Sequence, residues 1–362
     1  MNITILCKVV DNFGDIGVCY RMSRRLKNLH PADSINLVVS GLEAFHDINN
    51  QIDEKKSFQS VEGLDVYDWN DFSLCHEVFS ADDGEKLSVI LECFQCGRPE
   101  WMEKILFEDK LERTVQIIMI DYLTAEKYAD DFHCLQSLTR SSKVQKVNFM
   151  PGFTDKTGGL IIDEGWEEPV ERNVHGPVLF FMYENEWLPL AEALRKLEKN
   201  VLVGQGKGRD SFIDACSRCG MRNVDILPFM NQNEWDETMR SCSALFIRGE
   251  ESLSRACLSG IPFVWQAYPQ SEEYQMVKVE ALLEVMKAFF EPDDYEFLHK
   301  LWMDFNIPAA ERNEYNFERE CTEFLSDLEK FENGFHEFSL SLRKNGDLCN
   351  NLMTFIEKIG IM

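Results

Sequence analysis

The sequence lacks long hydrophobic stretches and any arrangement of cysteines that would suggest a disulfide framework. Its 362 residues contain no apolar run that approaches the roughly 18–20 residues of a membrane-spanning helix. The N-terminal segment is too short and too strand-like for a signal peptide. The twelve cysteines are scattered along a chain rich in core-forming residues, which indicates reduced thiols. We therefore expect a cytoplasmic protein that has no membrane association.

Basic residues are scarce relative to acidic ones. The chain has 37 Lys and Arg against 63 Asp and Glu, which gives a formal net charge of −26. Binding to a nucleic-acid backbone requires clustered positive charge, so we expect no nucleic-acid partner. The acidic excess instead favours a cationic partner. Because 44% of the residues are hydrophobic, the chain can bury a large core, and its length suggests two domains.

The usual sequence signatures of metal and nucleotide sites are absent or incomplete. The seven His show no metal-ligand spacing, Asp-x-Asp does not occur, and the two CxxC pairs lie too far apart to share a zinc ion, so we expect no metal. The P-loop pattern GxxxxGK[ST] is also absent. The glycine-rich segment 204–208 follows a predicted strand, but a dinucleotide fingerprint requires glycine where the chain has Arg209. A dinucleotide-dependent oxidoreductase is therefore disfavoured.

Apolar runs alternate with helical patterns in both halves of the chain. This alternation is typical of an α/β protein built from βαβ units, with parallel sheets covered on both faces. The predicted strands are 3–10, 35–39, 87–94, 115–120, 178–183, 201–203, 224–228, 244–247 and 262–265. The predicted helices are 18–29, 42–48, 101–107, 125–132, 186–197, 212–219, 234–242 and 253–258, and the chain is mostly helical from residue 271, ending with 348–359.

A stretch rich in Gly and Pro, residues 151–176, interrupts this alternation and suggests a connection between domains. We place the first domain at 1–170 and the second at 171–345. In open α/β sheets, ligands bind at the carboxyl ends of the strands. The loops that directly follow the predicted strands are therefore the first places to look for a site.

The loop after the first predicted strand, residues 11–17, contains two carboxylates. Asp11 and Asp15 can converge on one point at the end of the sheet, and two glycines in the loop permit close approach by a ligand. An alternative interpretation is that Asp15 is only the N-cap of the following helix. Equally, the two acids could form ion pairs with Lys8 and Arg21.

A second loop, residues 247–252, joins a predicted strand to a helix. The N–H groups of a helix N-terminus form an anion site, and Arg248, with Arg255 further along the helix, could neutralise an anionic ligand. Ser252 could cap the helix and contact a phosphate oxygen. The alternative is an ordinary capped helix with acids in its first turn.

Several aromatic residues lie near the predicted strand ends of the second half. Beside an anion site, aromatic faces are what a nucleotide base requires, although each of these residues taken singly is more often part of a core. They are Tyr183, Phe229, Trp235 and Tyr268.

Five segments, taken together and in order, resemble the bacterial protein-arginine rhamnosyltransferases that modify translation elongation factor P. They are CKVVDNFGDIGV (7–18), LECF (91–94), PGFTDKTGGL (151–160), IRGEES (247–252) and YPQ (268–270). The resemblance implies a GT-B glycosyltransferase fold with two facing Rossmann-like domains and a cleft between them. It places the acceptor side in the first domain and the donor side in the second, and it implies that residues 346–362 cross back to the first domain.

The resemblance also implies the reaction. The donor is dTDP-β-L-rhamnose, and the acceptor is an exposed arginine of elongation factor P. Attack on the face opposite the leaving group inverts the linkage from β to α. Neither a cofactor nor a metal is expected.

Roles for individual residues follow only from this resemblance. Asp15 corresponds to the general base, Asp11 to its partner and Glu250 to a third essential acid. The residues at the donor are Tyr183, Phe229, Gln232, Trp235, Arg248, Glu251, Ser252, Tyr268 and Gln270, with Asn12, Phe13 and Gly14 from the first loop. The sequence departs from the family at Glu251, where Asp is usual, and at Trp235, where Phe is frequent.

Two alternative functions stay open at this point. One is a GT-B transferase that uses another nucleotide sugar or another acceptor. The other is a non-catalytic nucleotide-binding module. Loss of Asp11, Asp15 or Glu250 would have favoured the module, and all three are present.

Overall fold

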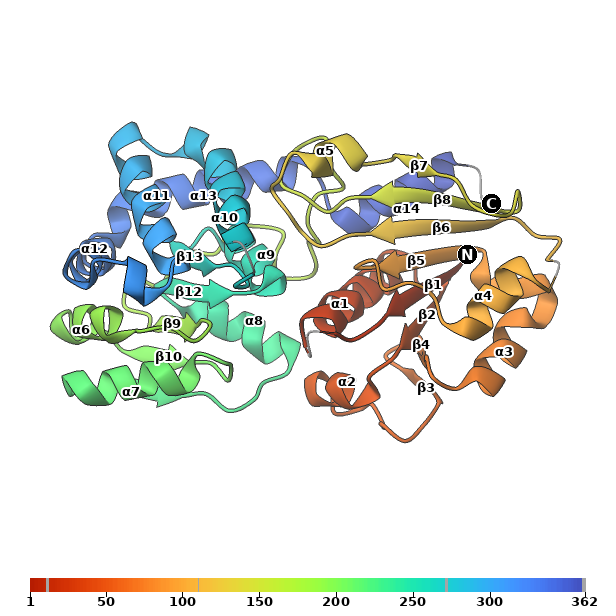
Figure 1. Ribbon diagram of the computed structural model, residues 1–362, viewed down its shortest axis with the longest axis horizontal. Helices are drawn as coiled ribbons and strands as arrows, with labels where there is room; N and C mark the ends of the chain where they lie inside the picture. Colours follow the sequence, from red (N-terminus) through yellow and green to blue (C-terminus); the bar gives the residue numbers. More distant parts are fainter. Residues whose placement is uncertain (11–12, 110, 271–272, 360–362) are drawn as a thin grey trace. The chain divides into compact units, whose positions relative to one another are not determined.

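The computed structural model describes residues 1–10, 13–109, 111–270 and 273–359, and the chain divides into two compact units. Unit 1 is formed by Met1–Glu164 and Asn345–Met362, and unit 2 by Gly165–Lys344 (Figure 1). We had placed the first boundary after residue 170. The chain enters unit 2 earlier because Trp166 is buried there, and its ring Nε1 donates a hydrogen bond to Asp236 at 3.1 Å.

Unit 1 contains an eight-stranded sheet that is parallel except at its two edges. The edge pairs β3–β4 and β7–β8 are antiparallel. Across the sheet the strands are β3 (Phe58–Val61), β4 (Leu64–Asp68), β2 (Ser34–Val39), β1 (Asn2–Cys7), β5 (Val89–Cys93), β6 (Val115–Ile120), β8 (Val144–Phe149) and β7 (Gln136–Ser137).

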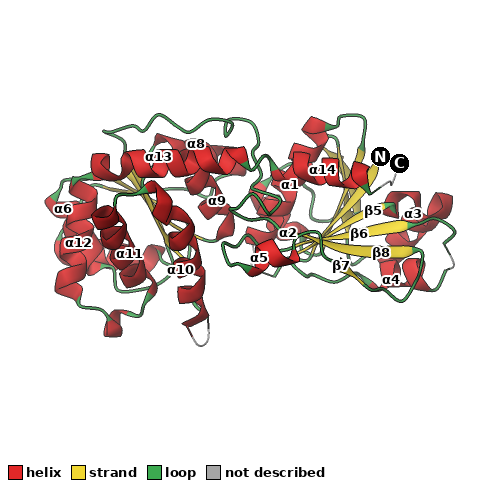
Figure 2. Cartoon of the chain, turned by 90° about the horizontal axis from the view of Figure 1, so that it is seen from above, coloured by secondary structure: helices red, strands yellow, loops and turns green. Residues whose placement is uncertain are grey.

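Helices cover both faces of this sheet (Figure 2). Successive strand residues point to opposite faces, so in β2 Leu37 and Val39 join one core while Val38 joins the other. The first core includes side chains of α1 (Gly14–Leu29), α2 (Leu42–Ile48) and α14 (Leu348–Lys358), and the second includes those of α3 (Phe72–Gly84) and α4 (Glu100–Phe107). The short helices η1 (Glu85–Leu87) and α5 (Tyr128–Phe132) complete the unit.

The last helix, α14, belongs to unit 1, which confirms the expected return of the chain (Figure 1). Its buried residues Leu352 and Met353 join the core beneath α1. Asp347 fixes the start of the helix, because its carboxylate accepts a hydrogen bond from Ile162 N at 2.8 Å and pairs with Arg25 at 3.1 Å. Asp347 thereby ties the C-terminal part of unit 1 to α1 and to Ile162.

Unit 2 contains a five-stranded, fully parallel sheet. Its strands, in order, are β11 (Val224–Ile226), β10 (Val201–Val203), β9 (Val178–Phe181), β12 (Ala244–Arg248) and β13 (Phe263–Gln266). The helices are α6 (Leu188–Lys196), α7 (Arg209–Cys219), α8 (Gln232–Ser241), α9 (Glu250–Ser259), α10 (Tyr274–Met286), η3 (Lys287–Phe289), α11 (Pro292–Asn306), η4 (Ala309–Glu311), α12 (Glu314–Ser326) and α13 (Leu328–Lys344).

The predicted strands and helices are confirmed, with their ends displaced by a few residues. The prediction missed β3, β4, α3, β7 and β8. The edge strands β3 and β7 are short and largely exposed, so they carry no buried apolar run. In α3 the backbone leaves the helical region at Ala81, and Asp82 and Asp83 take positive φ, which interrupts the helical pattern.

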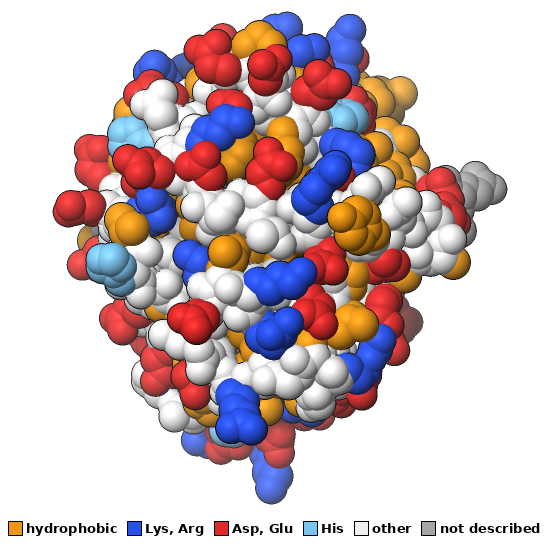
Figure 3. Space-filling view, turned by 90° about the vertical axis from the view of Figure 1, so that its left-hand side faces the viewer, with side chains coloured by type: hydrophobic (Ala, Val, Ile, Leu, Met, Phe, Trp, Pro, Cys, Tyr) orange, Lys and Arg blue, Asp and Glu red, His pale blue; other side chains and the backbone are white. Residues whose placement is uncertain are grey.

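The surface and the thiols agree with the composition. Acidic side chains are spread among Lys and Arg on the face of the molecule in Figure 3. All twelve cysteines lie among the described residues and are thiols rather than disulfides. Within the described part of the chain, we find no helix long and apolar enough to cross a membrane.

Candidate active site

Asp15 lies in the first turn of α1, the helix that follows β1. The N-cap of α1 is Phe13, so the interpretation of Asp15 as the helix cap is wrong. Its Oδ2 accepts a hydrogen bond from Val10 N at 2.9 Å, and its Oδ1 accepts one from the Tyr122 hydroxyl at 3.2 Å. The residue is only 2% exposed. This carboxylate is therefore buried and held by donors from two different loops.

The other predicted residues of this loop are partly outside the described chain. Asp11 and Asn12 are not among the described residues. Phe13 is 38% exposed, and Gly14 is the first residue of α1. Arg21, which we considered as a partner of the loop acids, forms an ion pair with Asp163 at 2.6 Å. This ion pair ties α1 to the C-terminal end of the segment Met1–Glu164.

Arg248 is the last residue of β12 in unit 2. Its guanidinium carbon lies 4.5 Å from the ring centre of Phe181 and 4.8 Å from that of Tyr183. Its Nε is buried and has no hydrogen-bond partner among the residues that the structure describes. A buried donor left without an acceptor is unfavourable, so this arginine is suited to an acceptor that arrives with a ligand.

The N-terminus of α9 follows Arg248 immediately. Gly249 turns the chain with φ +74° and ψ 158°, a conformation that essentially only glycine adopts, and it is the N-cap of the helix. The first N–H groups of any helix lack partners within the helix and carry partial positive charge. Because Gly249 is the N-cap, Ser252 belongs to the first turn of α9, and the prediction that it caps the helix is wrong. Glu250, the first residue of α9, lies 3.7 Å from Lys278 Nζ.

The predicted aromatic residues form a group around Arg248. Tyr183 is buried, and its ring is perpendicular to that of Tyr268 at 5.4 Å between centres. Trp235 packs against Phe181 at 4.8 Å, so Phe181 links it to Arg248. Phe181 was not predicted as a site residue, although it lies in the predicted strand 178–183 and is the last residue of β9.

The remaining predicted donor residues lie at the edges of this group. Phe229 is 46% exposed in the loop before α8. Gln232 begins α8, and its amide donates a hydrogen bond to Glu251 Oε1 at 3.5 Å. The backbone N of Gln270 donates to the Gln275 side chain at 3.1 Å. The contact between Gln232 and Glu251 connects the first turns of α8 and α9.

A scan against protein families gives a match over nearly the whole chain. The model described as "Elongation-Factor P (EF-P) rhamnosyltransferase EarP" matches residues 3–357. The chain belongs to this family. The resemblance that the motifs suggested is thereby confirmed.

Similar proteins and structures support this membership. The chain is 31% identical to the protein-arginine rhamnosyltransferase of Pseudomonas aeruginosa over 336 residues, which cover 83% of this chain and 86% of that protein. It is 28% identical to the enzyme of the same name from Shewanella oneidensis, covering 82% and 84%.

Solved structures show the fold. A structure described as the basis for EarP-mediated arginine glycosylation of translation elongation factor EF-P matches 99% of both chains, with a TM-score of 0.58 and 19% identity. A UDP-glucose:anthocyanidin 3-O-glucosyltransferase matches 98% of both, with a TM-score of 0.56 and 10% identity. The expected GT-B fold is therefore confirmed.

The glycine-rich segment 204–208 lies against the aromatic group, which sequence reasoning missed. A Cβ on Gly204 would lie 2.9 Å from both Phe181 and Trp235, and one on Gly206 would lie 3.0 Å from Phe181. Lys207 Nζ lies 5.5 Å from the ring centre of Tyr268. The glycines therefore allow a backbone to approach the aromatic rings, even though the dinucleotide fingerprint is broken. The sequence signal that could have indicated this role is the position of the segment directly after the strand β10.

Arg255, considered from the sequence as an anion ligand, is a core residue. It is 1% exposed, and its guanidinium lies over the ring of Trp166 at 5.1 Å. Arg255 lies about one and a half helical turns after the N-terminus of α9, and its side chain is buried in the core. That Arg255 neutralises a bound anion stays a prediction.

Metal-ligating side chains do not gather in the part of the chain that the structure describes. No group of three or more His, Cys, Asp or Glu side chains there has an arrangement that could hold a metal ion. In the CxxC pairs, burial raises the pKa of the Cys216 thiol to about 12 and also raises the pKa of the Cys96 thiol. Burial therefore favours the protonated thiol at both positions, which lowers their reactivity as nucleophiles.

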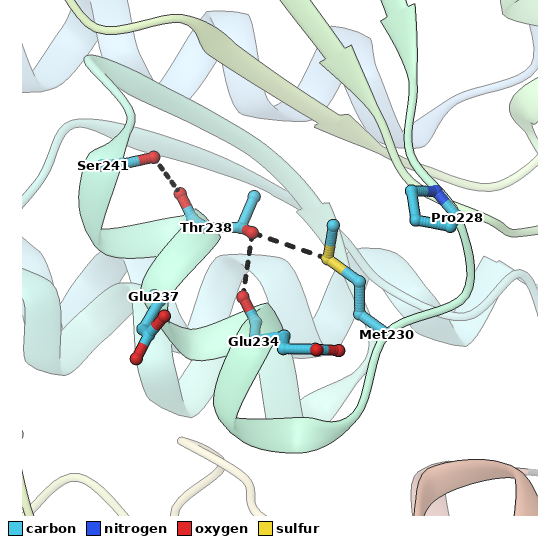
Figure 4. A pocket seen from close by; sticks show the side chains of 6 residues that line it. All are labelled: Pro228, Met230, Glu234, Glu237, Thr238 and Ser241. Atoms are coloured by element: carbon cyan, nitrogen blue, oxygen red, sulfur yellow. Dashed lines mark hydrogen bonds between the residues drawn. The ribbon is translucent and has the colours of Figure 1, made fainter.

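A cavity of about 420 Å³ lies along α8 (Figure 4). It is lined by Pro228, Met230, Glu234, Glu237, Thr238 and Ser241. The hydroxyls of Thr238 and Ser241 bond to backbone oxygens of the same helix. Pro228 and Met230 of the lining flank the predicted donor residue Phe229 in the sequence.

Proposed function

We propose that this chain transfers an L-rhamnosyl group from dTDP-β-L-rhamnose to an arginine side chain of translation elongation factor P, with inversion to an α linkage. Membership of the EarP family supports the enzyme class and the acceptor. The names of relatives from two genera support arginine as the modified residue. The donor nucleotide, the stereochemistry and the residue roles are part of the proposal.

The observation that carries the proposal is the buried Nε of Arg248, which has no hydrogen-bond partner among the described residues. The helix that follows, α9, presents its N-terminal N–H groups at the same strand end. An anion at this point gains hydrogen bonds from both. In a chain of net charge −26, such a local positive site is the feature that a nucleoside diphosphate needs.

The aromatic group next to Arg248 supports a nucleotide rather than a simple anion. Tyr268 is 44% exposed and Phe229 is 46% exposed, so each offers a ring face to a ligand. Aromatic faces stack on bases at a gain of about 1–3 kcal/mol per base. We assign the base to this group and the diphosphate to Arg248, with Ser252 and the N–H groups of α9.

The catalytic step requires help for a poor nucleophile. A guanidinium has a pKa above about 12 and a delocalised lone pair. We assign Asp15 as the base that takes a proton from the attacking nitrogen while the nitrogen bonds to the anomeric carbon and the diphosphate leaves. Asp11, on the same loop, is the second carboxylate of the grip on the guanidinium. Glu250 positions the sugar.

Neither a metal nor a cofactor enters this mechanism. Arg248 and the helix N-terminus supply the positive charge that the leaving diphosphate requires. The acceptor is a translation factor, which supports action in the cytoplasm.

The direct test is intact-mass spectrometry of elongation factor P after incubation with this protein and one nucleotide sugar at a time. We expect a mass gain of one deoxyhexosyl group with dTDP-rhamnose, and no gain with UDP-glucose, GDP-mannose or NAD. An acceptor whose target arginine is replaced by lysine is the matched control and should stay unmodified. A gain with another sugar only, or no gain with any, would contradict the proposal.

A further inference from the structure

Tyr122, which sequence reasoning did not single out, lies beside the proposed base. It follows β6 directly, and its hydroxyl donates a hydrogen bond to Asp15 Oδ1 at 3.2 Å. The other carboxylate oxygen of Asp15 is held by the backbone N of Val10 at 2.9 Å. The two donors come from different loops, so together they fix the direction of the carboxylate.

The ring of Tyr122 is stacked on Phe94, which follows β5. The two ring centres are 4.6 Å apart and the planes differ by 21°. Tyr122 is still 38% exposed, so the pair offers an aromatic surface to solvent beside a buried carboxylate.

The loop that carries Phe94 is held in an uncommon conformation. Phe94 has φ +56° and Gln95 has φ +52°, values that non-glycine residues rarely adopt and that cost free energy. Two bonds hold it there: Phe94 N donates to Ile120 O at 2.7 Å, and the Gln95 amide donates to Asp121 Oδ2 at 3.0 Å. Both bonds tie this loop to the residues just before Tyr122. The aromatic pair is therefore built by two loops that restrain each other.

We propose that Tyr122 has two roles in the reaction proposed above, on which this inference rests. Its hydroxyl is a positioning group that orients the carboxylate of Asp15. Its ring, with that of Phe94, receives the planar guanidinium of the acceptor arginine. Guanidinium groups stack on aromatic faces. A ring face directly beside a carboxylate provides both the stacking surface and the opposite charge that an arginine side chain requires.

The two roles make different predictions for two variants. Tyr122→Phe keeps the ring and removes the hydroxyl. It should leave the KM for elongation factor P within about twofold and lower kcat about tenfold, the lower end for loss of a hydrogen bond to a charged group. A donor hydrogen bond favours the ionised form of the carboxylate over the protonated form. The acid limb of the kcat–pH profile should therefore move to higher pH.

Tyr122→Leu removes the ring as well. It should show the same loss of kcat and, in addition, raise the acceptor KM about fivefold, within the range for a lost cation–π contact. Phe94→Leu should raise the acceptor KM and leave the pH profile in place, since the hydroxyl of Tyr122 stays. The affinity for dTDP should not change in any of the three.

Tyr315→Phe and Tyr315→Leu are the matched controls, because Tyr315 is 77% exposed and belongs to unit 2. Both should behave like the unaltered protein. Melting temperatures of all variants identify any that are misfolded, and the conservative Tyr122→Phe variant keeps the test valid if Tyr122→Leu is one of them. If the unaltered protein gives no product, the proposed function fails. Two results would overturn the inference about Tyr122 while the proposed function stands, provided that the unaltered protein gives product. The first is a Tyr122→Phe variant with the kcat and pH profile of the unaltered protein. The second is a Tyr122→Leu variant with the same acceptor KM as Tyr122→Phe.

Discussion

Replacing Arg248 with methionine separates a ligand-binding arginine from a structural one. Methionine has an unbranched side chain of similar reach, so it keeps apolar contact with Phe181 and Tyr183. It removes the guanidinium that lies 4.5 Å and 4.8 Å from their ring centres. It also removes the buried Nε, for which the described residues supply no acceptor.

The expected effect on ligand binding is large. Hydrogen bonds to charged groups contribute about 1.5–3 kcal/mol. Since about 1.4 kcal/mol is a factor of ten, the Kd for dTDP should rise about 10- to 150-fold. The enthalpy of binding should become less favourable, because charge-assisted bonds to the diphosphate are lost.

The expected effect on the unligated protein is small. Removing a buried donor without a partner relieves a penalty of about 1–3 kcal/mol. The lost cation–π contacts cost about 0.5–2 kcal/mol, which is similar in size and opposite in sign. The melting temperature without ligand should therefore stay within a few degrees of the original, since about 1 kcal/mol moves it by roughly 2–4 °C in a unit of this size.

Titration calorimetry with dTDP and thermal melting check both effects. Arg218→Met is the matched control: it also removes one positive charge from unit 2, but Arg218 is 44% exposed and pairs with Glu186 at 2.9 Å. It should leave the dTDP affinity unchanged. Unaltered dTDP binding by Arg248→Met would refute the assignment of the diphosphate. A large fall in its melting temperature would show that Arg248 is structural.

Three further predictions concern metal, packing and pH. EDTA should leave the initial rate of transfer unchanged, and an absolute requirement for added Mg²⁺ would contradict the metal-free mechanism. Leu352→Ala should destabilise unit 1 by about 2–5 kcal/mol in urea unfolding, because it leaves a cavity between α14 and the core; a loss below about 0.5 kcal/mol would argue against that packing. Burial lowers the pKa of His133 below its usual 6.5, so the contribution of His133 to stability is complete above pH 6.5 and is lost as the pH falls below that value. The melting temperature of His133→Asn should therefore fall less steeply between pH 7 and 5 than that of the unaltered protein, and identical profiles would contradict this.

The sequence predicted the architecture because periodicity is a local property. Buried parallel strands are continuous apolar runs, as in Val115–Ile120, and helices that cover them have apolar residues every third or fourth position. The edge strands could not be found in this way. In β3 only Gln59 is buried, and the pairing of β3 with β4 depends on a turn in which Glu62 and Gly63 both take positive φ.

Residues of the candidate site were predictable where a charged side chain lies in the loop or at the helix start that follows a predicted strand. Asp15 and Arg248 were found for that reason. The burial of Arg255 could not be predicted, because a helical residue near a site can equally point into the core, and its contact with Trp166 joins residues distant in sequence. Tyr122 and the 204–208 segment were missed because their neighbours, Asp15 and Phe181, are distant in sequence. Contacts between loops after different strands arise from the order of strands in the sheet, which periodicity does not encode.

One measurement tests the central claim most directly: a time course of intact-mass spectra of elongation factor P with dTDP-rhamnose and either the unaltered protein or Asp15→Asn. The unaltered protein should convert the acceptor fully to a species one deoxyhexosyl group heavier. Asp15→Asn keeps the shape of the side chain, loses its charge and should give no product, while calorimetry shows dTDP binding within about twofold of the original. Substantial product from Asp15→Asn would show that the base is elsewhere, and no product from the unaltered protein would contradict the proposed reaction itself.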